Sequence, residues 1–384
     1  MKKKQVKDMS LMQEKSDNIV LFYPQVSELA KKQVLDTLDS RWIGQGPKVK
    51  SFEESFSRKF GSNRSAIAVG SGTDALHLSY ILAGLSPGDE VIAPLFTCTA
   101  TNIPFLYMGV KINFADIDSE TMNIDVDHVR QLMNENVKAI ICVHYGGLPC
   151  DMDELQSIAD DWGVPVIEDA AHAIGARYKG TDIGSISDFT MFSFQAIKHI
   201  TTGDGGMLIV KNKDLLDKAE RIRWFGIDRK SKQAGIWEND ITEVGYKYQM
   251  TDIAAAMGIA SLSEFDIHSK HRKTLFSLYE NELQACERLK IIGSGFKDRE
   301  HAAWLFTVVV QDRYTLQKKL RDHGIESNQV HFRNDRYSIF KDFTDGKTFP
   351  NMDKIEEDYL VLPLHTKMTE NDVKRVCFVI KSGW

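Results

Sequence analysis

The sequence predicts an α/β fold built around a mostly parallel β-sheet. Through the first two thirds of the 384 residues, short apolar or β-branched segments alternate with segments of helical period, which is the pattern of a parallel sheet covered by helices. Hydrophobic residues make up 42% of the chain and charged residues 27%, so it can bury a core and is neither disordered nor fibrous. A prior of about 150 residues per domain gives two or three domains, and we start from two.

Seven segments are predicted to be strands, because each is an apolar or β-branched run of about the usual strand length. They are residues 65–69, 90–96, 110–116, 137–143, 164–169, 189–194 and 206–210. Between them, helical period predicts helices over residues 74–84, 126–135 and 152–163. Gly163 ends the last of these, since glycine readily takes the left-handed backbone that closes a helix.

The pattern changes after about residue 250, where a long helical stretch over 251–284 is followed by mixed strand and helix. We therefore predict a large domain over 19–265 and a smaller C-terminal domain over 266–384. Residues 1–18 begin with a basic run but lack the apolar region of a secretory signal. They are predicted to be a flexible, solvated tail.

Charge and cysteine content exclude several classes of protein. The net charge is −6 and the pI is about 6.0, whereas a nucleic-acid binder normally carries a basic face. No apolar run approaches the roughly 18 to 20 residues that span a bilayer. The five cysteines are odd in number and widely spaced, without a zinc-type cluster. We expect a cytoplasmic protein with no metal, no nucleic-acid partner and no membrane partner.

A small-residue turn between a strand and a helix is the first candidate site. In IAVGSGTDALHLS, residues 67–79, Gly72 and Thr73 stand where backbone N–H groups at a helix N-terminus can stabilise a phosphate. A dinucleotide fingerprint would need a third glycine, and the P-loop pattern is absent. A tight turn without a ligand remains an equal alternative.

The second candidate site follows the strand in VIEDAAHAIGARYKG, residues 166–180. Asp169 ends this strand at the carboxyl edge of the sheet, where open α/β folds bind ligands. An acid there could hold a protonated heterocycle nitrogen, and His172 could donate to a ring oxygen. The alternatives are that Asp169 caps a following helix and that His172 is a satisfied core histidine.

Lys198 is the third candidate, and it lies between an aromatic strand and a glycine-rich turn over residues 203–206. Burial there would depress the pKa of the amine and make it a Schiff-base nucleophile; most single lysines are instead solvated surface groups. Pyridoxal phosphate (PLP) chemistry needs a lysine, an acid against the pyridine nitrogen and a phosphate cup together. All three elements occur in one predicted domain.

The chain resembles the fold-type I, PLP-dependent sugar aminotransferases of the DegT/StrS family over roughly residues 19–384. The resemblance implies a large domain on a mostly parallel seven-stranded sheet and a smaller α+β C-terminal domain. It is carried by segments in the family's order: RWIGQGPKVKSFEESF (41–56), GSGTDALHL (70–78), PGDEVIAP (87–94), VHYGGLPCDMDEL (143–155), VIEDAAHAIGA (166–176), SFQAIKHITTGDGG (193–206), GYKYQMTDIAAAMG (245–258) and LVLPLHTKMTENDV (360–373).

The resemblance assigns a role to each candidate. Lys198 would bind PLP covalently and then move protons, Asp169 would keep the pyridine nitrogen protonated, and His172 would lie near the ring hydroxyl. Family members with histidine in place of this lysine are sugar dehydratases, so Lys198 favours transamination. Phosphate binding is assigned to three residues: Gly72, Thr73 and Ser193.

Two departures from the family pattern concern the cofactor. Cys98 stands in FTCTAT where many relatives place an aromatic residue over the ring, and Phe96 is two residues away. Lys247 and Gln249 replace an Asn and an Arg of the family's GYNYRM segment. That segment crosses the dimer interface in relatives, which implies a homodimer with shared active sites. Lys247 is then expected to reach the neighbouring phosphate as a point charge, unless it is an ordinary surface lysine.

The resemblance implies transfer of an amino group from an amino acid, with L-glutamate as the expected donor, through PLP to a keto sugar. The acceptor is expected to be linked to a nucleotide diphosphate, and the product to serve amino-sugar and polysaccharide biosynthesis. Two alternatives stay open: a free keto sugar acid as acceptor, and a non-catalytic PLP-binding or sensory protein. Retention of Lys198 and Asp169 argues against the second.

Overall fold

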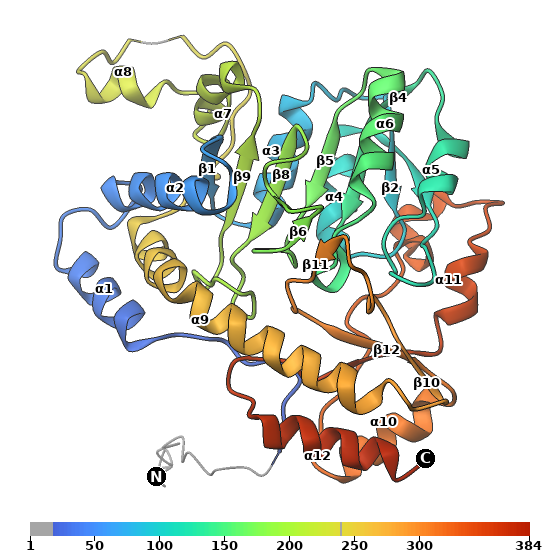
Figure 1. Ribbon diagram of the computed structural model, residues 1–384. Coiled ribbons are helices and arrows are strands. Elements are labelled where there is room, and N and C mark those ends of the chain that lie inside the picture. Colours follow the sequence, from blue (N-terminus) through green and yellow to red (C-terminus); the bar gives the residue numbers. More distant parts are fainter. Residues whose placement is uncertain (1–17, 239) are drawn as a thin grey trace, which may run out of the picture.

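The seven predicted strands form one sheet with the order β1-β9-β8-β5-β4-β2-β3 (Figure 1). The computed structural model describes residues 18–238 and 240–384, so the predicted tail, except for Asn18, lies outside the described residues. β9 is antiparallel to β1 and β8, whereas the other pairs in this sheet are parallel. The strands are β1 Ser65–Val69, β2 Glu90–Pro94, β3 Lys111–Ala115, β4 Val137–Val143, β5 Val166–Asp169, β8 Phe189–Ser193 and β9 Gly206–Val210. The predicted α/β class with a mostly parallel sheet is confirmed.

Both faces of this sheet are covered by helices. Successive side chains of a strand point to opposite faces, and β4 shows this alternation. Ala139 and Ile141 pack in the apolar cluster that includes α3, while Ile140 and Cys142 pack in the cluster that includes α2 and α6. The bounds of these helices are α2 Pro47–Phe60, α3 Gly72–Leu82 and α6 Met152–Trp162.

The predicted helices form with small changes at their ends. Gly163 closes α6 in the left-handed region at φ 65°, as the sequence indicates. The helix predicted over 126–135 is α5 and ends at Leu132, because Met133 has an extended backbone at φ −62° and ψ 133°. The remaining helices of this part are α1 Glu28–Leu38, α4 Thr99–Met108, α5 Val126–Leu132, α7 Leu216–Ile222 and α8 Arg229–Gln233.

The long helical stretch is one helix of 32 residues, α9 Asp252–Leu283. It packs against α1 and α2 near its start and against α12 Glu370–Lys381 further on, so it joins the two parts of the molecule (Figure 1). The predicted boundary at residue 265 falls inside α9 and stays a prediction.

A smaller antiparallel sheet lies below the carboxyl edge of the large one, with the order β10-β12-β13 (Figure 1). Apolar residues of this sheet pack with α9, α10 and α12 in a cluster of their own, which gives the predicted α+β character. Its elements are β10 Leu289–Ile291, β12 Phe306–Val310, β13 Tyr359–Leu362, α10 Arg313–Asp322 and α11 Pro350–Ile355.

Short elements complete the fold. A further sheet has the order β11-β6-β7, and its strands are β6 Arg177–Tyr178, β7 Thr181–Asp182 and β11 Arg299–Glu300. The short 3-10 helices are η1 Tyr145–Gly147, η2 Lys213–Leu215, η3 Asn334–Arg336 and η4 Ser338–Phe343. Within the described ranges, no helix combines the length and the apolar character needed to cross a membrane.

Asp252 ties the start of α9 to the start of α2. Its carboxylate is fully buried and accepts from the backbone N–H groups of Gly46 at 2.7 Å, Val49 at 3.0 Å and Lys48 at 3.1 Å. The first N–H groups of a helix have no partner within the helix, and a carboxylate there is also favoured by the helix dipole. Asp252 therefore fixes the position of both helices.

We predict that Asp252→Ala lowers the free energy of unfolding by about 2 to 4 kcal/mol, because buried donors lose a charged acceptor. Urea unfolding at a fixed protein concentration measures this change. The matched control is Asp214→Ala in the exposed η2 turn, which is expected to change stability by less than about 0.5 kcal/mol. Equal midpoints for the two variants would refute the role of Asp252.

Candidate active site

Three of the predicted residues meet at the carboxyl edge of the large sheet. Asp169 is the last residue of β5, His172 lies in the turn that follows, and Lys198 follows β8. The Lys198 amine lies 3.6 Å from the ring centroid of Trp304. Trp304 in turn stacks on His172, with ring centroids 3.7 Å apart. We call Lys198, Asp169, His172 and Trp304 the Lys198 group.

Asp169 is a buried carboxylate with two hydrogen-bond donors. The Thr101 hydroxyl donates to Oδ2 at 2.7 Å, and the Ala171 N–H donates to Oδ1 at 3.1 Å. Burial raises the pKa of Asp169, whereas these hydrogen bonds and the Lys198 charge act in the opposite direction. In the described chain no helix begins after β5, so the helix-cap alternative for Asp169 is not observed.

The Lys198 amine lies in an environment that favours its neutral form. Burial lowers the pKa of Lys198 to about 7, although the Asp169 carboxylate and the Cys98 thiol act in the opposite direction. The residue as a whole is half-buried, so a reactant can still approach it. A neutral amine near pH 7 is the form that attacks an aldehyde.

The pKa of Lys198 determines how the rate of covalent PLP binding depends on pH. We expect apoenzyme to react with PLP at a rate that rises up to about pH 7 and is level above it, because the amine is then deprotonated. Stopped-flow absorbance measures the rate. A parallel reaction of PLP with acetyl-lysine methylamide, a free lysine analogue, corrects for the effect of the titration of PLP itself. A corrected rate that keeps rising toward the ordinary lysine pKa of about 10.4 would contradict the burial of Lys198.

His172 is buried and neutral. Its pKa lies well below the ordinary value because of burial and the Lys198 charge. The Gly146 N–H donates to Nδ1 at 3.3 Å, which assigns the ring proton to Nε2. His331 lies parallel to His172, with 5.2 Å between ring centroids and 3° between ring planes. His172 thus has an Nε2–H donor available for an acceptor such as a ring oxygen.

The residues predicted to bind phosphate surround the first turn of α3. Ser71 caps this helix by accepting from the Asp74 N–H at 3.0 Å. Gly72 begins the helix, and a Cβ at Gly72 would lie 3.1 Å from Cβ of Ser193. Thr73 is the next residue, half-buried in the same turn. Free N–H groups of a helix N-terminus and a serine hydroxyl are suited to a phosphate.

Cys98 and Lys247 are more exposed than the other predicted site residues. Cys98 is exposed at the start of α4, close enough to Lys198 to influence its pKa. Phe96 is buried and packs against Tyr145, with ring centroids 5.2 Å apart. Lys247 is exposed and its amine donates to Gln249. No contact between Lys247 and the Lys198 group is seen among the described residues of one chain.

Trp304 and His331 were missed by the sequence reasoning. Burial lowers the pKa of His331 to about 3, and its Nε2 atom is buried without a hydrogen-bond partner in the described structure. Trp304 lies outside every segment that carries the family resemblance, and His331 was not assigned a role of its own from the sequence. Both come from the C-terminal part of the chain and meet Lys198 only through the fold.

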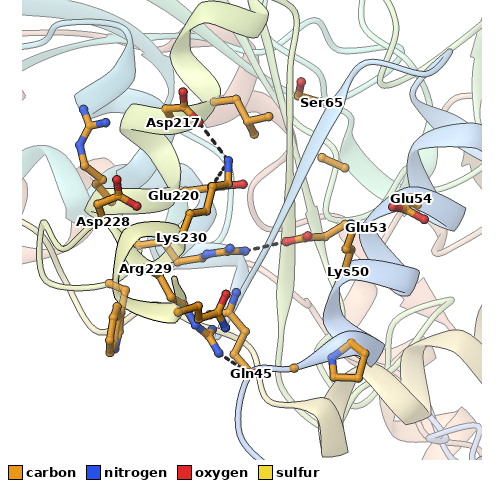
Figure 2. A pocket seen from close by; sticks show the side chains of 18 of the residues that line it. Gln45, Lys50, Glu53, Glu54, Ser65, Asp217, Glu220, Asp228, Arg229 and Lys230 are labelled. Carbon is orange, nitrogen blue, oxygen red and sulfur yellow. Dashed lines mark hydrogen bonds and ion pairs between the residues drawn. The ribbon is translucent and has the colours of Figure 1, made fainter. Parts of the chain in front are cut away.

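The large cavity in Figure 2 is separate from the Lys198 group. Its volume is about 780 Å³, and it lies between α2, α7 and α8 beside Ser65, at the amino end of β1. Many of its charges are already paired. Arg223 contacts Glu53 at 2.6 Å, and Lys230 contacts Glu220 at 2.8 Å. The site that the sequence predicts is therefore at the opposite edge of the sheet.

A buried cluster in the sheet core was also missed by the sequence reasoning. Possible ligand atoms of Cys142, His144 and Cys150 lie within 4.8 Å of one another. Both imidazole nitrogens are engaged, however, because Nε2 lies 2.9 Å from Glu168 and Nδ1 accepts from the Cys150 N–H at 3.1 Å. These contacts tie β4, β5 and the turn at Cys150 together, and the cluster lies outside the Lys198 group.

The residues of the Lys198 group and the α3 N-terminus fit PLP. The amine has a lowered pKa, a carboxylate lies near it in the core, and the first turn of α3 offers N–H groups beside Ser193. These are the groups that bind the aldehyde, the pyridine nitrogen and the phosphate of this cofactor.

Comparisons with known proteins agree with this fit. The model of the DegT/DnrJ/EryC1/StrS aminotransferase family matches residues 24–381. SpsC of Bacillus subtilis, a spore coat polysaccharide biosynthesis protein, is 33% identical over 97% of this chain and 98% of its own length.

Solved structures of two other proteins are among those with the same fold. The sugar aminotransferase CalS13 from Micromonospora echinospora has a TM-score of 0.90 at 30% identity, covering 95% of this chain and 99% of its own. Spr1654 from Streptococcus pneumoniae, solved in PMP and PLP forms, has a TM-score of 0.89 at 30% and 29% identity, covering 95% of this chain and 98% of its own.

Proposed function

The chain belongs to the DegT/DnrJ/EryC1/StrS aminotransferase family and is a PLP-dependent aminotransferase, and from this premise we propose that it moves an amino group from L-glutamate to a keto sugar linked to a nucleoside diphosphate. The predicted resemblance, cofactor and class of activity are confirmed by the family. The keto sugar, its nucleotide, the amino donor and the roles of individual residues are the proposal.

The observation that carries the proposal is the Lys198 group. When bound, PLP supplies an electron sink for the carbon that loses or gains the amino group. The neutral Lys198 amine can hold the cofactor and later move a proton at the reacting carbon, since its pKa of about 7 permits both directions. Asp169 would hold the proton on the pyridine nitrogen, and His172 would donate from Nε2 to the ring oxygen.

A neutral imidazole beside Lys198 favours a sugar as the acceptor. The imidazole of His331 is uncharged, and its Nε2 atom has no partner in the described chain. A neutral imidazole makes a single hydrogen bond to a hydroxyl, which is the chemistry of a sugar ring. The names of SpsC and CalS13 support the same substrate class.

The Arg333 guanidinium is not free to bind the carboxylate of a free sugar acid. A free acid would need a cation for its carboxylate. The Arg333 guanidinium is buried and already paired with Asp335 at 2.7 Å, Glu356 at 2.9 Å and Asp353 at 2.5 Å. The charge of Arg333 is therefore already balanced by carboxylates of this chain.

A homodimer is part of the proposal. Large apolar side chains lie exposed on the segment between α8 and α9 and on the segment before α2, including Trp237 at 74%, Val244 at 77% and Ile43 at 52%. Exposed large apolar side chains are a feature of interaction surfaces. Lys247 lies in the same segment as Val244, so a second copy seated there would give Lys247 access to the partner's phosphate site.

Product analysis with defined acceptors tests the proposal. Holoenzyme with L-glutamate is given dTDP-, UDP- or GDP-linked keto-deoxysugars, or a free keto sugar acid, and 2-oxoglutarate and the amino sugar are measured by mass spectrometry. Amino sugar formed on a nucleotide-linked acceptor supports the proposal. Product with the free acid alone supports the first alternative, and no product from any of these acceptors would contradict the proposed donor and acceptor.

A further inference from the structure

Buried hydrogen bonds connect Asp169 to the C-terminal part of the chain through residues 97 and 101. The Thr101 hydroxyl donates to Asp169 Oδ2 at 2.7 Å, and the Thr97 hydroxyl lies 2.8 Å from the Thr101 hydroxyl. The Asn334 side-chain N–H donates to the Thr97 carbonyl at 2.8 Å. Thr101 and Asn334 are 0% exposed, and Thr97 is 2% exposed.

The chemistry of these groups fixes the direction of the hydroxyl bonds. An ionised carboxylate only accepts, so Thr101 must donate its single proton to Asp169. Thr101 Oγ1 can then only accept in its contact with Thr97, and Thr97 must be the donor. Both hydroxyl dipoles thus point toward Asp169, and such a chain polarises along its length in a low-dielectric interior.

Asn334 holds the segment that carries these threonines. Its backbone N–H donates to the Leu95 carbonyl at 2.7 Å, and its side-chain oxygen accepts from Asn102 at 2.9 Å. The two ends of the segment are therefore bound to one residue of η3. Because this residue lies beyond β12, the position of Thr101 depends on the C-terminal part of the chain.

We propose that Thr101 is a positioning residue for Asp169: its hydroxyl holds the carboxylate ionised and aimed at the pyridine nitrogen, while Thr97 and Asn334 hold Thr101 in place. The inference rests on the proposed role of Asp169. Thr101 does not touch the reacting atoms in this account. Its effect is on the proton shared between Asp169 and the cofactor.

The test compares Thr101→Val with Thr101→Ser, using holoenzyme with PLP labelled with ¹⁵N in the ring. Solid-state ¹⁵N NMR reports whether the ring nitrogen is protonated, independently of turnover. Loss of the Thr101 donor should shift the ring-nitrogen resonance toward the neutral form and lower kcat by about 10- to 100-fold, the effect of one hydrogen bond to a charged group. Thr101→Ser keeps the hydroxyl, so its ring-nitrogen resonance and its kcat should both stay close to those of the unaltered enzyme.

Thr99→Val is the matched control, because Thr99 lies in the same first turn of α4 but outside the hydroxyl chain. A ¹⁵N resonance in Thr101→Val equal to that of Thr99→Val would overturn the inference and leave the proposed function intact. A neutral ring nitrogen in the unaltered enzyme would overturn the role of Asp169 as well. If Thr101→Val fails to bind PLP, Thr97→Val decides: a partial shift supports the chain, and an unshifted resonance overturns it.

Discussion

Lys198→Ala is expected to lower the rate of amino transfer by about 10⁴-fold, because one amine provides both the nucleophile and the proton-transfer group. Asp169 and the α3 N-terminus remain, so PLP is still expected to bind without a covalent link. Borohydride reduction followed by peptide mass spectrometry measures this link directly. In the unaltered protein, the cofactor mass should appear on the peptide that contains Lys198.

The matched control for this variant is Lys213→Ala in the exposed η2 turn. It should keep both the covalent label and full turnover. Covalent labelling that persists after Lys198→Ala would show that another amine holds the cofactor, and the assignment of the Lys198 group would then be wrong.

Asp169→Asn is expected to keep PLP bound and to lower kcat by about 10²- to 10³-fold, the size of effect seen when one electrostatic partner of the transition state is removed. The amide keeps the shape of the carboxylate and its contact with Thr101, but it cannot stabilise a proton on the pyridine nitrogen. Cofactor content from absorbance and kcat from 2-oxoglutarate formation separate binding from turnover.

Asp161→Asn provides the comparison for this second variant, since Asp161 is an exposed residue at the end of α6. It should behave like the unaltered enzyme. Turnover in Asp169→Asn within a factor of about two of this control would remove Asp169 from the account, since an effect that small lies far below the loss of one electrostatic partner.

The central sheet could be predicted because its strands are local patterns. Each strand is a short apolar run, and the carboxyl ends of parallel strands meet at one edge of the sheet. Asp169 follows one such strand and Lys198 another, so their meeting follows from strand order and the resemblance to a family. The alternation of Ile140 and Ile141 between opposite faces is likewise a property of any strand.

The partners of these residues could not be predicted in the same way. Trp304, His331 and Asn334 reach the site from the C-terminal part of the chain, and no periodicity or spacing relates them to Lys198. Thr101 lies in a segment whose sequence drew attention to Cys98 instead. Its hydrogen bond to Asp169 depends on how α4 packs on the sheet, which is decided by tertiary contacts.

The absorbance spectrum of holoenzyme before and after addition of L-glutamate tests the central claim most directly. If Lys198 binds PLP for amino transfer, the visible band of the covalently bound cofactor should disappear, and one equivalent of 2-oxoglutarate should form per site. Addition of a nucleotide-linked keto sugar should then restore the band. A band that stays unchanged with L-glutamate and with every other amino acid tested, and yields no keto acid, would contradict the account.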